Sequence, residues 1–513
     1  MAQVLTGEPL LPPPVGTLRE AMVRLSRRRG NWLTVHNGTN SQAVSGAELN
    51  LLARRWARVF QEAGVSRGDR VVLLLPNDLP FVAAFLGCQY MGAVAVPVAW
   101  PVSLLDLGRA LSVLCPLVEN SGARVVVTTP AVAQVGPFGL PTLTAPHELP
   151  ARGVVPPSPA DPSFIQYTSG SLGRPRGVVV THRAAVASAW SMGQALGVGP
   201  DSGSVDVGVS WLPLFHDMGL VGGLLCPLLR RFPVHLMSPG EFLLHPVRWL
   251  RLITEARGTV CAAPDFAYQL AERRVRSLDG LDLSSWRHAL NGAEPVHRAT
   301  LDAFAARFAP AGFSASAMRP VYGLAENTLG VCFSRAGDPD AVRDGRTVVS
   351  VGRPLPGMTV TTSPDGEVLV SGPACMAGYH NDPVATGQAL RDGWLHTGDL
   401  GFVADDQLYL TGREKDLVIQ HGRKFHPYDI ERVAAASVDA PPNGAAAFTG
   451  TDDVLIVVVE TASGVDDVER KVRGELLAVL GVRPHRVVQV GPGELPRTSS
   501  GKIRRTLCVE RFA

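Results

Sequence analysis

The first 180 residues alternate helical patterns with short apolar runs, and this alternation limits the folds open to the chain. Residues 45–62 carry apolar side chains at helical spacing, and residues 70–76, RVVLLLP, form a compact apolar run. A second apolar helix is expected over 80–92, and two further strand patterns follow at 93–98 and 124–130. Helices that alternate with short buried strands are typical of βαβ units and mostly parallel sheets.

The pattern changes near residue 360. Residues 359–372 and 400–412 each read as two β-rich runs around a turn, which predicts antiparallel hairpins at the end of a large domain. At 513 residues the chain is too long for a single core. We therefore expect an α/β N-terminal domain (1–411), with parallel-rich sheets, helices and a small β subdomain. A hinge (412–416) joins it to a small α+β C-terminal domain (417–513).

Charge and composition exclude several classes of function. The net charge is +2, with acids interspersed among the arginines, so no basic surface for nucleic acid is expected. No apolar run reaches the roughly 20 residues that a membrane-spanning helix needs. The seven cysteines are scattered without a CxxC pair, and the N-terminus lacks the order of a signal peptide. These features predict a cytoplasmic protein.

One stretch rich in glycine and hydroxyl groups has the composition of a phosphate-binding loop. Residues 166–182 read QYTSGSLGRPRGVVVTH, in which backbone N–H groups and hydroxyls can surround phosphate oxygens. The spacing does not fit a Walker loop, and a flexible surface loop is the alternative. The candidate ligand-binding residues are Thr168, Ser169, Gly170, Ser171, Gly173 and Gly177.

Four further motifs each contain a polar group in an apolar or glycine-rich setting. WLPLFHDMGLVGG contains His216 beside Asp217, which equally describes a core histidine satisfied by one carboxylate. NGAEPV contains Glu294, and YGLAEN contains Glu326, a carboxylate suited to Mg²⁺ when it lies next to a triphosphate. HTGDLG contains Asp399, which is suited to accept hydrogen bonds from two ribose hydroxyls.

Lysine usage singles out the last motif. Of 48 basic residues only four are lysine, and the first 414 residues contain none. One of the four, Lys502, lies in PRTSSGKIRR near the C-terminus, and another, Lys415, lies beside Arg413 and Asp416 at the expected hinge. The alternatives are an exposed tail charge for Lys502 and a solvated charged linker for the hinge residues.

Five blocks, in this order and spacing, resemble the adenylate-forming superfamily. They read YTSGSLGRPRGV, YGLAEN, HTGDLG, TGREKDLVI and PRTSSGKIRR, and the likeness extends from about residue 15 to 508. The superfamily includes acyl-CoA synthetases, luciferases, peptide-synthetase adenylation domains and fatty acyl-AMP ligases. The resemblance implies that a carboxylic acid and Mg-ATP give an acyl-adenylate and pyrophosphate, after which the acyl group passes to a thiol.

The resemblance also implies a role for each candidate residue. The loop from Thr168 to Gly177 would close on the β- and γ-phosphates. His216 would gate the acid and pyrophosphate region, and Lys415 would be the pivot about which the small domain rotates. The remaining nucleotide and metal contacts would come from Gly292, Ala293 and Glu294 beside the base, Tyr322 and Gly323 against adenine, Glu326 at Mg²⁺, and Asp399 with Arg413 at the ribose.

Lys502 matches the lysine that bridges the substrate carboxylate and the α-phosphate. Two anions meet in that step, and a compact ammonium on a flexible stem fits between them better than a planar guanidinium. This accounts for a lysine in a chain that otherwise uses arginine. Arg176 stands where relatives often have lysine, which suggests that either cation suffices there.

The motifs are most similar to the fatty acyl-AMP ligases, with two departures. Ala325 stands where the wider superfamily usually has threonine, a mark of that branch. Residues 327–350, however, lack the extra segment thought to disfavour CoA in those ligases, and Leu172 replaces a threonine of the phosphate loop. We expect an acyl-AMP ligase for a long-chain, polyketide or terpenoid acid of secondary metabolism. Its thiol acceptor is either an acyl carrier protein or CoA, because the missing segment leaves both open.

Two other functions remain open from sequence. The first is a complete acyl-CoA ligase. The second is a relative that binds adenylates without forming them, although the presence of Glu326, Asp399 and Lys502 argues against it.

Overall fold

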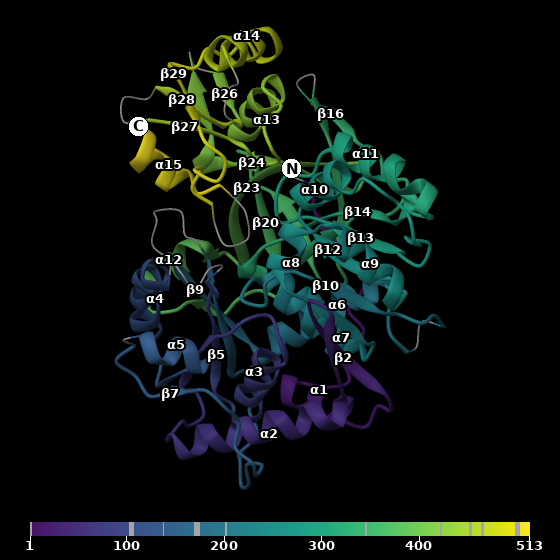
Figure 1. The fold of residues 1–513 in the computed structure, drawn as a ribbon, viewed down its shortest axis with the longest axis vertical. Coiled ribbons are helices and arrows are strands. Elements are labelled where there is room, and N and C mark those ends of the chain that lie inside the picture. The colour runs from purple at the N-terminus through teal and green to yellow at the C-terminus, as the bar shows by residue number, and fades with distance from the viewer. Residues whose placement is uncertain are drawn as a thin grey trace.

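The computed structural model describes residues 3–101, 107–136, 138–168, 175–200, 203–343, 346–420, 423–450, 454–462, 466–497 and 503–513. Within these ranges it has a large α/β part and a smaller C-terminal α+β part (Figure 1). The expected fold class is confirmed. Helix α2 (Gly46–Glu62) lies at one end of the molecule, and helix α14 (Val468–Leu480) of the C-terminal part lies at the other.

The first sheet of the large part has the strand order β21-β9-β8-β5-β4-β6-β7. Strands β4 to β8 pair in parallel, as the alternation of helix and strand predicts, and β9 and β21 add antiparallel strands at one edge. The bounds are β4 (Arg70–Leu74), β5 (Val94–Pro97), β6 (Val125–Thr128), β7 (Thr142–Leu143), β8 (Pro162–Thr168), β9 (Arg176–Thr181) and β21 (Gly378–Tyr379).

The second sheet is long and mixed, in the order β1-β19-β20-β23-β24-β18-β15-β14-β13-β12-β10-β11-β2-β3, with β22 paired to β23. Its parallel part, from β2 to β14, is bounded as β2 (Asn31–Asn37), β10 (Gly208–Ser210), β11 (Val234–Met237), β12 (Val260–Ala263), β13 (His288–Asn291) and β14 (Met318–Gly323). The antiparallel strands are β1 (Leu5–Thr6), β3 (Asn40–Ser45), β15 (Gly330–Phe333), β18 (Ser350–Pro354), β19 (Thr359–Thr362), β20 (Glu367–Ser371), β22 (Leu390–Arg391), β23 (Trp394–Ala404) and β24 (Gln407–Arg413).

The two hairpins expected after residue 360 are present as β19–β20 and β23–β24. They do not form sheets of their own, because β15 pairs with both β14 and β18 and so joins them to the parallel strands. The segment between YGLAEN and the next block also holds a small hairpin of β16 (Ala341–Arg343) and β17 (Arg346–Val348).

Helices cover the sheets of the large part, and their ends follow local signals. In α2, Ser45 and Glu48 form a capping box. Helix α3 is capped by Asp78 at its N-terminus and by Gly92, whose φ is 70°, at its C-terminus. The helices are α1 (Leu18–Leu25), α2 (Gly46–Glu62), α3 (Leu79–Met91), α4 (Leu107–Ser121), α5 (Pro130–Val135), α6 (His182–Leu196), α7 (Cys226–Arg230), α8 (Pro239–Leu244), α9 (Val247–Ala256), α10 (Asp265–Arg274), α11 (Arg298–Phe308) and α12 (Pro383–Ala389). Shorter helical turns are η4 (Ala309–Ala311), η5 (Ala315–Ala317), η6 (Ala325–Asn327) and η7 (Glu414–Asp416), and η3 (Met218–Leu225) is a π-helix.

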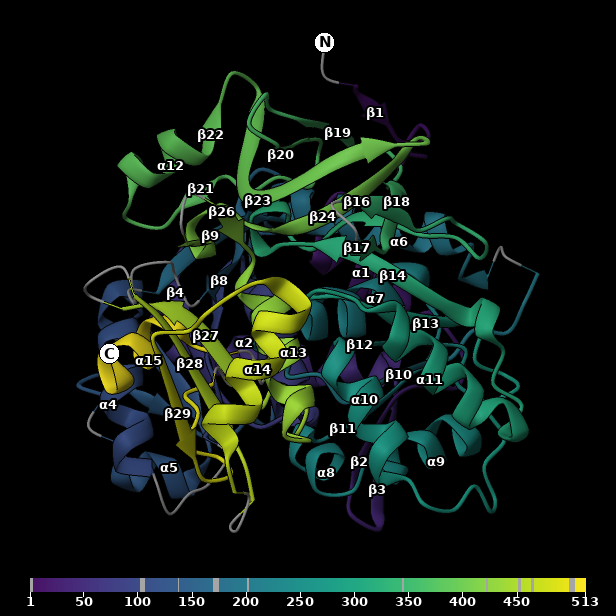
Figure 2. The ribbon, with the colours of Figure 1, turned by 90° about the horizontal axis from the view of Figure 1, so that it is seen from above.

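The C-terminal part is built on the sheet β27-β28-β29. Alternate residues of β27 and β28 belong to two separate cores, one shared with α13 and α14 and the other with α15, as the side-chain alternation of strands requires. Figure 2 shows these elements gathered on one side of the molecule. The bounds are β25 (Val418–Gln420), β26 (Arg423–Phe425), α13 (Pro427–Ser437), β27 (Ala445–Thr449), β28 (Leu455–Glu460), α14 (Val468–Leu480), β29 (Arg486–Val490) and α15 (Arg505–Phe512).

No helix in the described ranges combines the length and the apolar character needed to cross a bilayer.

Candidate functional site

Three of the predicted motifs follow the carboxyl ends of parallel strands. Strands β10, β12, β13 and β14 run in parallel. The segment 211–217 follows β10, the turn 292–294 follows β13, and residues 324–326 follow β14. Ligands of open α/β sheets bind at this edge, and the pairing explains how motifs more than 70 residues apart meet.

Asp399 is at the centre of a hydrogen-bonded cluster, which we call the Asp399 cluster (Tyr322, Asp399 and Arg413). Tyr322 and Asp399 are buried, and the Arg413 side chain is half exposed. The Tyr322 hydroxyl donates to Asp399 Oδ2 at 2.7 Å, and Arg413 Nε donates to Oδ1 at 2.7 Å. Asp399 and Arg413 are paired across β23 and β24, which fixes their spacing. Each carboxylate oxygen has a further lone pair, so the cluster fits a ribose diol as acceptor.

The charges of the Asp399 cluster are set by its neighbours. The Asp399 carboxylate raises the pKa of the Arg413 guanidinium, which stays protonated. Burial, reinforced by the Asp399 charge, raises the pKa of the Tyr322 phenol well above its usual value. Both partners are therefore permanent donors to Asp399, whose side chain is held in one orientation.

Glu326 lies in η6 and is joined to a tyrosine from a distant segment. The Tyr379 hydroxyl donates to Glu326 Oε1 at 2.8 Å, and the Arg176 guanidinium carbon lies 5.3 Å from the centre of the Tyr379 ring. Burial, followed by the charge of Glu326, raises the pKa of Tyr379. The hydrogen bond uses one carboxylate oxygen of Glu326. A single carboxylate combined with substrate phosphates is a usual Mg²⁺ donor set, so the residues present fit that ion.

His216 and Asp217 end an ordered loop between β10 and η3. His216 Nδ1 lies 2.7 Å from Asp217 Oδ1, and the same oxygen accepts the Met218 N–H at 2.7 Å. Asn77 holds this loop from the first sheet, donating to the Leu212 carbonyl at 2.7 Å and accepting the Leu214 N–H at 2.8 Å. The His216 side chain is 27% exposed, which distinguishes it from a core histidine.

The turn Gly292–Ala293–Glu294 is strained and tightly packed. Ala293 has a φ of 69°, a left-handed value that non-glycine residues rarely adopt, and such strain concentrates at functional sites. A Cβ at Gly292 would lie 2.6 Å from the Val321 carbonyl oxygen, and one at Gly323 would collide with the Leu329 carbonyl, so both positions require glycine.

Glu294 accepts hydrogen bonds from both the large part and the C-terminal part. Its Oε1 accepts the Phe266 N–H at 2.6 Å, and its Oε2 accepts from the Asn443 side chain of the C-terminal part at 3.2 Å. The residue therefore touches the small domain in this conformation, a contact that its motif did not predict.

The phosphate-loop motif starts and ends on neighbouring strands. Thr168 ends β8 and Gly177 lies on β9, where they pair with Arg176 and Tyr167 respectively. The predicted residues between them, Ser169, Gly170, Ser171 and Gly173, lie outside the described residues.

The expected hinge starts inside a strand, since β24 extends to Arg413. Lys415 is exposed in η7, the turn that leads into the C-terminal part. Asp416, the next residue, lies 3.5 Å from Arg505 Nη1, and Arg505 also makes a bidentate ion pair with the buried Glu431.

Lys502 lies outside the described residues. The residues on each side of its segment, Arg497 and Ile503, form an antiparallel bridge, and Arg497 is held by both oxygens of Glu460 at 3.0 and 2.6 Å.

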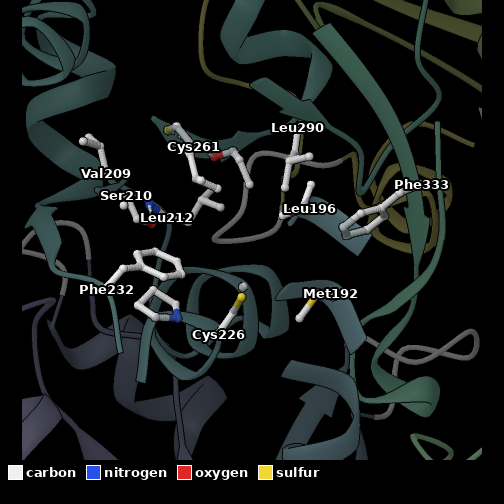
Figure 3. Close-up of a pocket in the computed structure, with 16 residues that line it drawn as sticks. Met192, Leu196, Val209, Ser210, Leu212, Cys226, Phe232, Cys261, Leu290 and Phe333 are labelled. Atoms are coloured by element: carbon white, nitrogen blue, oxygen red, sulfur yellow. Dashed lines mark hydrogen bonds between the residues drawn. The ribbon is translucent and has the colours of Figure 1, made fainter. Parts of the chain in front are cut away.

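An apolar pocket adjoins the loop that holds His216. It lies between strands β10, β12 and β13 and the helices α6, η3 and α7, and its cavity volume is about 40 Å³ (Figure 3). Apart from Ser210 its side chains are apolar, including those of Met192, Cys226, Phe232 and Leu290. An apolar lining of this kind suits an aliphatic group.

Sequence reasoning missed several members of this region. Tyr379 was not predicted, because it lies 53 residues from Glu326 and belongs to a two-residue strand. Asn77 and Gln166, which hold the His216 loop, also gave no signal, since each is a single amide in a common sequence.

Comparison with known proteins agrees with this geometry. The chain is 34% identical to the long-chain-fatty-acid–AMP ligase FadD26 of Mycobacterium tuberculosis over 541 residues, covering 89% of this chain and 91% of the relative. It is 33% identical to the medium-chain-fatty-acid–[acyl-carrier-protein] ligase JamA of Moorena producens, covering 92% and 90%. A structure from a study of fatty acyl-adenylate ligases of E. coli and L. pneumophila superimposes with a TM-score of 0.89 at 31% identity, covering 98% of this chain and 99% of that one.

Residues 23–380 match the family described as AMP-binding enzyme. The resemblance expected from the motifs is therefore confirmed, as is the expectation of an adenylate-forming ligase. The chain belongs to the AMP-binding enzyme family.

Proposed function

We propose that this protein activates an aliphatic carboxylic acid with ATP and Mg²⁺, forming an acyl-adenylate, and then transfers the acyl group to a thiol. The observation that carries the proposal is the position of the apolar pocket, which borders the His216 loop at the edge where the nucleotide motifs meet. An apolar tail in this pocket directs a carboxylate toward that edge. The names of the relatives FadD26 and JamA support a fatty acid as substrate.

In this proposal the large domain binds and orients ATP. Asp399, held by Tyr322 and Arg413, accepts the ribose hydroxyls, and Glu326 holds Mg²⁺ against the phosphates. Tyr322, Gly323, Gly292, Ala293 and Glu294 surround the base, and Thr168 to Gly177 surround the β- and γ-phosphates. A carboxylate oxygen of the acid attacks the α-phosphorus, and the bond to pyrophosphate breaks as Lys502 neutralises the anions that meet there.

In the second half-reaction, Lys502 must move away from the acyl-adenylate so that the thiol can approach. We infer that the C-terminal domain (417–513) rotates about residues 412–416, with Lys415 as the pivot, so that a thiol can reach the acyl carbon and displace AMP. The contacts between the two parts support this proposal, because those of the described residues are polar or stacking contacts at the surface between them. They include Asn443 with Glu294, Arg273 with the Ala440 carbonyl, Arg346 with Asp429, and His297 stacked on Tyr428.

The favoured acceptor is the thiol of an acyl carrier protein, as in the name of JamA. CoA is the second candidate, because the described residues 327–343 and 346–349 between η6 and β18 hold β15 and the short hairpin β16–β17 and no further helix or strand. We further propose a cytoplasmic location.

ATP–pyrophosphate exchange with a panel of acids tests the proposed function. Saturated acids of increasing length should support exchange, whereas amino acids and aromatic acids should not, because the pocket has no ion-pairing group for an ammonium. Exchange with amino acids alone would overturn the assignment to aliphatic substrates, and the absence of exchange with every acid would favour a non-adenylating relative.

A further inference from the structure

A second cavity lies behind the apolar pocket, and we call it the arginine cavity. It is formed by the start of β14, the turn after β15, the end of β18, the end of α6 and residues 6–8 of the N-terminus. Its cavity volume is about 450 Å³, and it is partly open to solvent. Three arginines line it: Arg319, Arg335 and Arg353.

Two of these arginines already have acidic partners. Arg335 lies 3.1 Å from Glu8, and Arg353 lies 3.0 Å from Asp338. Asp338 also accepts the Arg335 N–H at 2.7 Å, so its two oxygens are engaged. Glu8 and Asp338 are therefore already paired with Arg335 and Arg353.

Arg319 differs from both. Its Nε is buried and has no hydrogen-bond partner among the described residues. Burial, followed by the charge of Arg335, lowers its pKa, although a guanidinium remains protonated at neutral pH. Asp338 is the acidic neighbour whose charge acts on Arg319, but both of its oxygens are bonded to other groups. A partly buried cation with so little compensation is costly, and an anion in the cavity would lower that cost.

Ser334 adds a second donor without a partner. The residue is 3% exposed and lines the same cavity, and within the described ranges its hydroxyl makes no hydrogen bond. Arg319 and Ser334 both line the cavity, and guanidinium and hydroxyl groups bind carboxylates and phosphates.

The arginine cavity shares a wall with the apolar pocket. Leu196 and Phe333 line both, and Figure 3 shows them on the same side of the apolar pocket as Leu290. Leu290 and Arg319 are paired in the parallel strands β13 and β14, so their side chains project from the same face of the sheet. Arg319 therefore lies one strand beyond the wall of the apolar pocket.

We propose that the arginine cavity is an anion-binding site in which Arg319 and Ser334 hold a carboxylate or phosphate group. The group has two possible sources. One is the distal carboxylate of an acid substrate whose chain passes between Leu196 and Phe333, which rests on the proposed function. The other is a separate small anion that enters from solvent, which does not.

The first arm of the test compares substrates. ATP–pyrophosphate exchange is measured with dicarboxylic acids of increasing length and with the monocarboxylic acids of equal length. If the distal carboxylate is the ligand, the ratio of diacid to monoacid kcat/KM falls by about tenfold or more in Arg319→Gln, the scale of one hydrogen bond to a charged group. Ser334→Ala, which removes only the hydroxyl, should lower the same ratio by a smaller factor.

Arg58→Gln is the matched control, because Arg58 belongs to an exposed ion pair with Glu62 on helix α2. It removes the same charge and should leave the ratio unchanged.

The second arm measures thermal stability with inorganic phosphate and with succinate. If a separate anion is the ligand, Tm rises saturably in the wild type and in Arg58→Gln, the rise is lost in Arg319→Gln, and the diacid ratio does not change. This arm requires no catalysis, so it still tests the cavity if no acid supports exchange. A diacid ratio and an anion-dependent Tm that are both unaffected by Arg319→Gln and Ser334→Ala would overturn the proposal.

Discussion

In the large domain the residues proposed to bind the nucleotide are bonded to one another, whereas the C-terminal domain touches them through separate contacts. Asp399 has donors on both oxygens, from Tyr322 and Arg413. Across the boundary, Asn443 makes a single 3.2 Å hydrogen bond to Glu294. A bonded cluster keeps its geometry when a neighbour leaves, and a single contact can be exchanged. The comparison indicates a fixed binding site and a movable domain that completes it.

The largest expected effect comes from the movable side. Lys502→Ala should lower ATP–pyrophosphate exchange by about a hundredfold or more, because one charge contact in the transition state is removed. ATP binding, measured by calorimetry, should remain close to wild type, since the other contacts belong to the large domain. Lys502→Arg should lower ATP–pyrophosphate exchange as well. Substantial exchange in that variant would contradict the role of a compact ammonium.

In the large domain, Asp399→Ala should weaken the binding free energy of ATP by about 1.5–3 kcal/mol, the scale of hydrogen bonds to a charged acceptor. Tyr322→Phe is the matched variant, because it leaves Asp399 in place and removes one of its two donors. Its loss in nucleotide affinity should be smaller. Equal affinity for ATP in Asp399→Ala and wild type would remove Asp399 from the ribose site.

The hinge connects the two sides. Lys415→Pro restricts backbone rotation at the pivot and at the residue before it, and should slow thiol transfer by about tenfold relative to adenylation. Lys415→Ala keeps the backbone free and should alter this ratio little. Transfer is followed from isolated acyl-adenylate, with carrier protein and CoA in separate reactions. A proline variant that transfers at the wild-type rate would exclude the pivot.

The smallest effect is expected at the boundary itself. Asn443→Ala should shift the ratio of the two half-reactions by about two- to fivefold, the scale of one partly exposed hydrogen bond. Asn443→Asp places a second carboxylate beside Glu294 and should shift the ratio further in the same direction. Opposite shifts in these two variants would show that the contact does not hold the observed orientation.

Much of the fold follows from the sequence, because its signals are local. Helices α2 and α3 and the hairpins β19–β20 and β23–β24 lie where periodicity and turn residues place them. The attachment of the hairpins to the parallel strands through β15 depends on pairing between distant segments, which local pattern does not encode.

Some residues of the candidate site can likewise be predicted from local motifs, and others are found only in the structure. Asp399, Glu326 and Tyr322 are found from motifs, because each lies in a short glycine-rich block. Tyr379 and Arg319 are found only in three dimensions: the first completes Glu326 from another sheet, and the second is one arginine among many until its missing partner is seen.

The fate of the oxygen atoms tests the central claim most directly. An aliphatic acid labelled with oxygen-18 in its carboxylate is incubated with ATP, Mg²⁺ and the thiol acceptor, and the nucleotide product is analysed by mass spectrometry. If the carboxylate attacks the α-phosphorus, AMP acquires one heavy oxygen when the thiol displaces it, and pyrophosphate acquires none. Unlabelled AMP, or ADP with labelled phosphate, would contradict an acyl-adenylate and with it the proposed function.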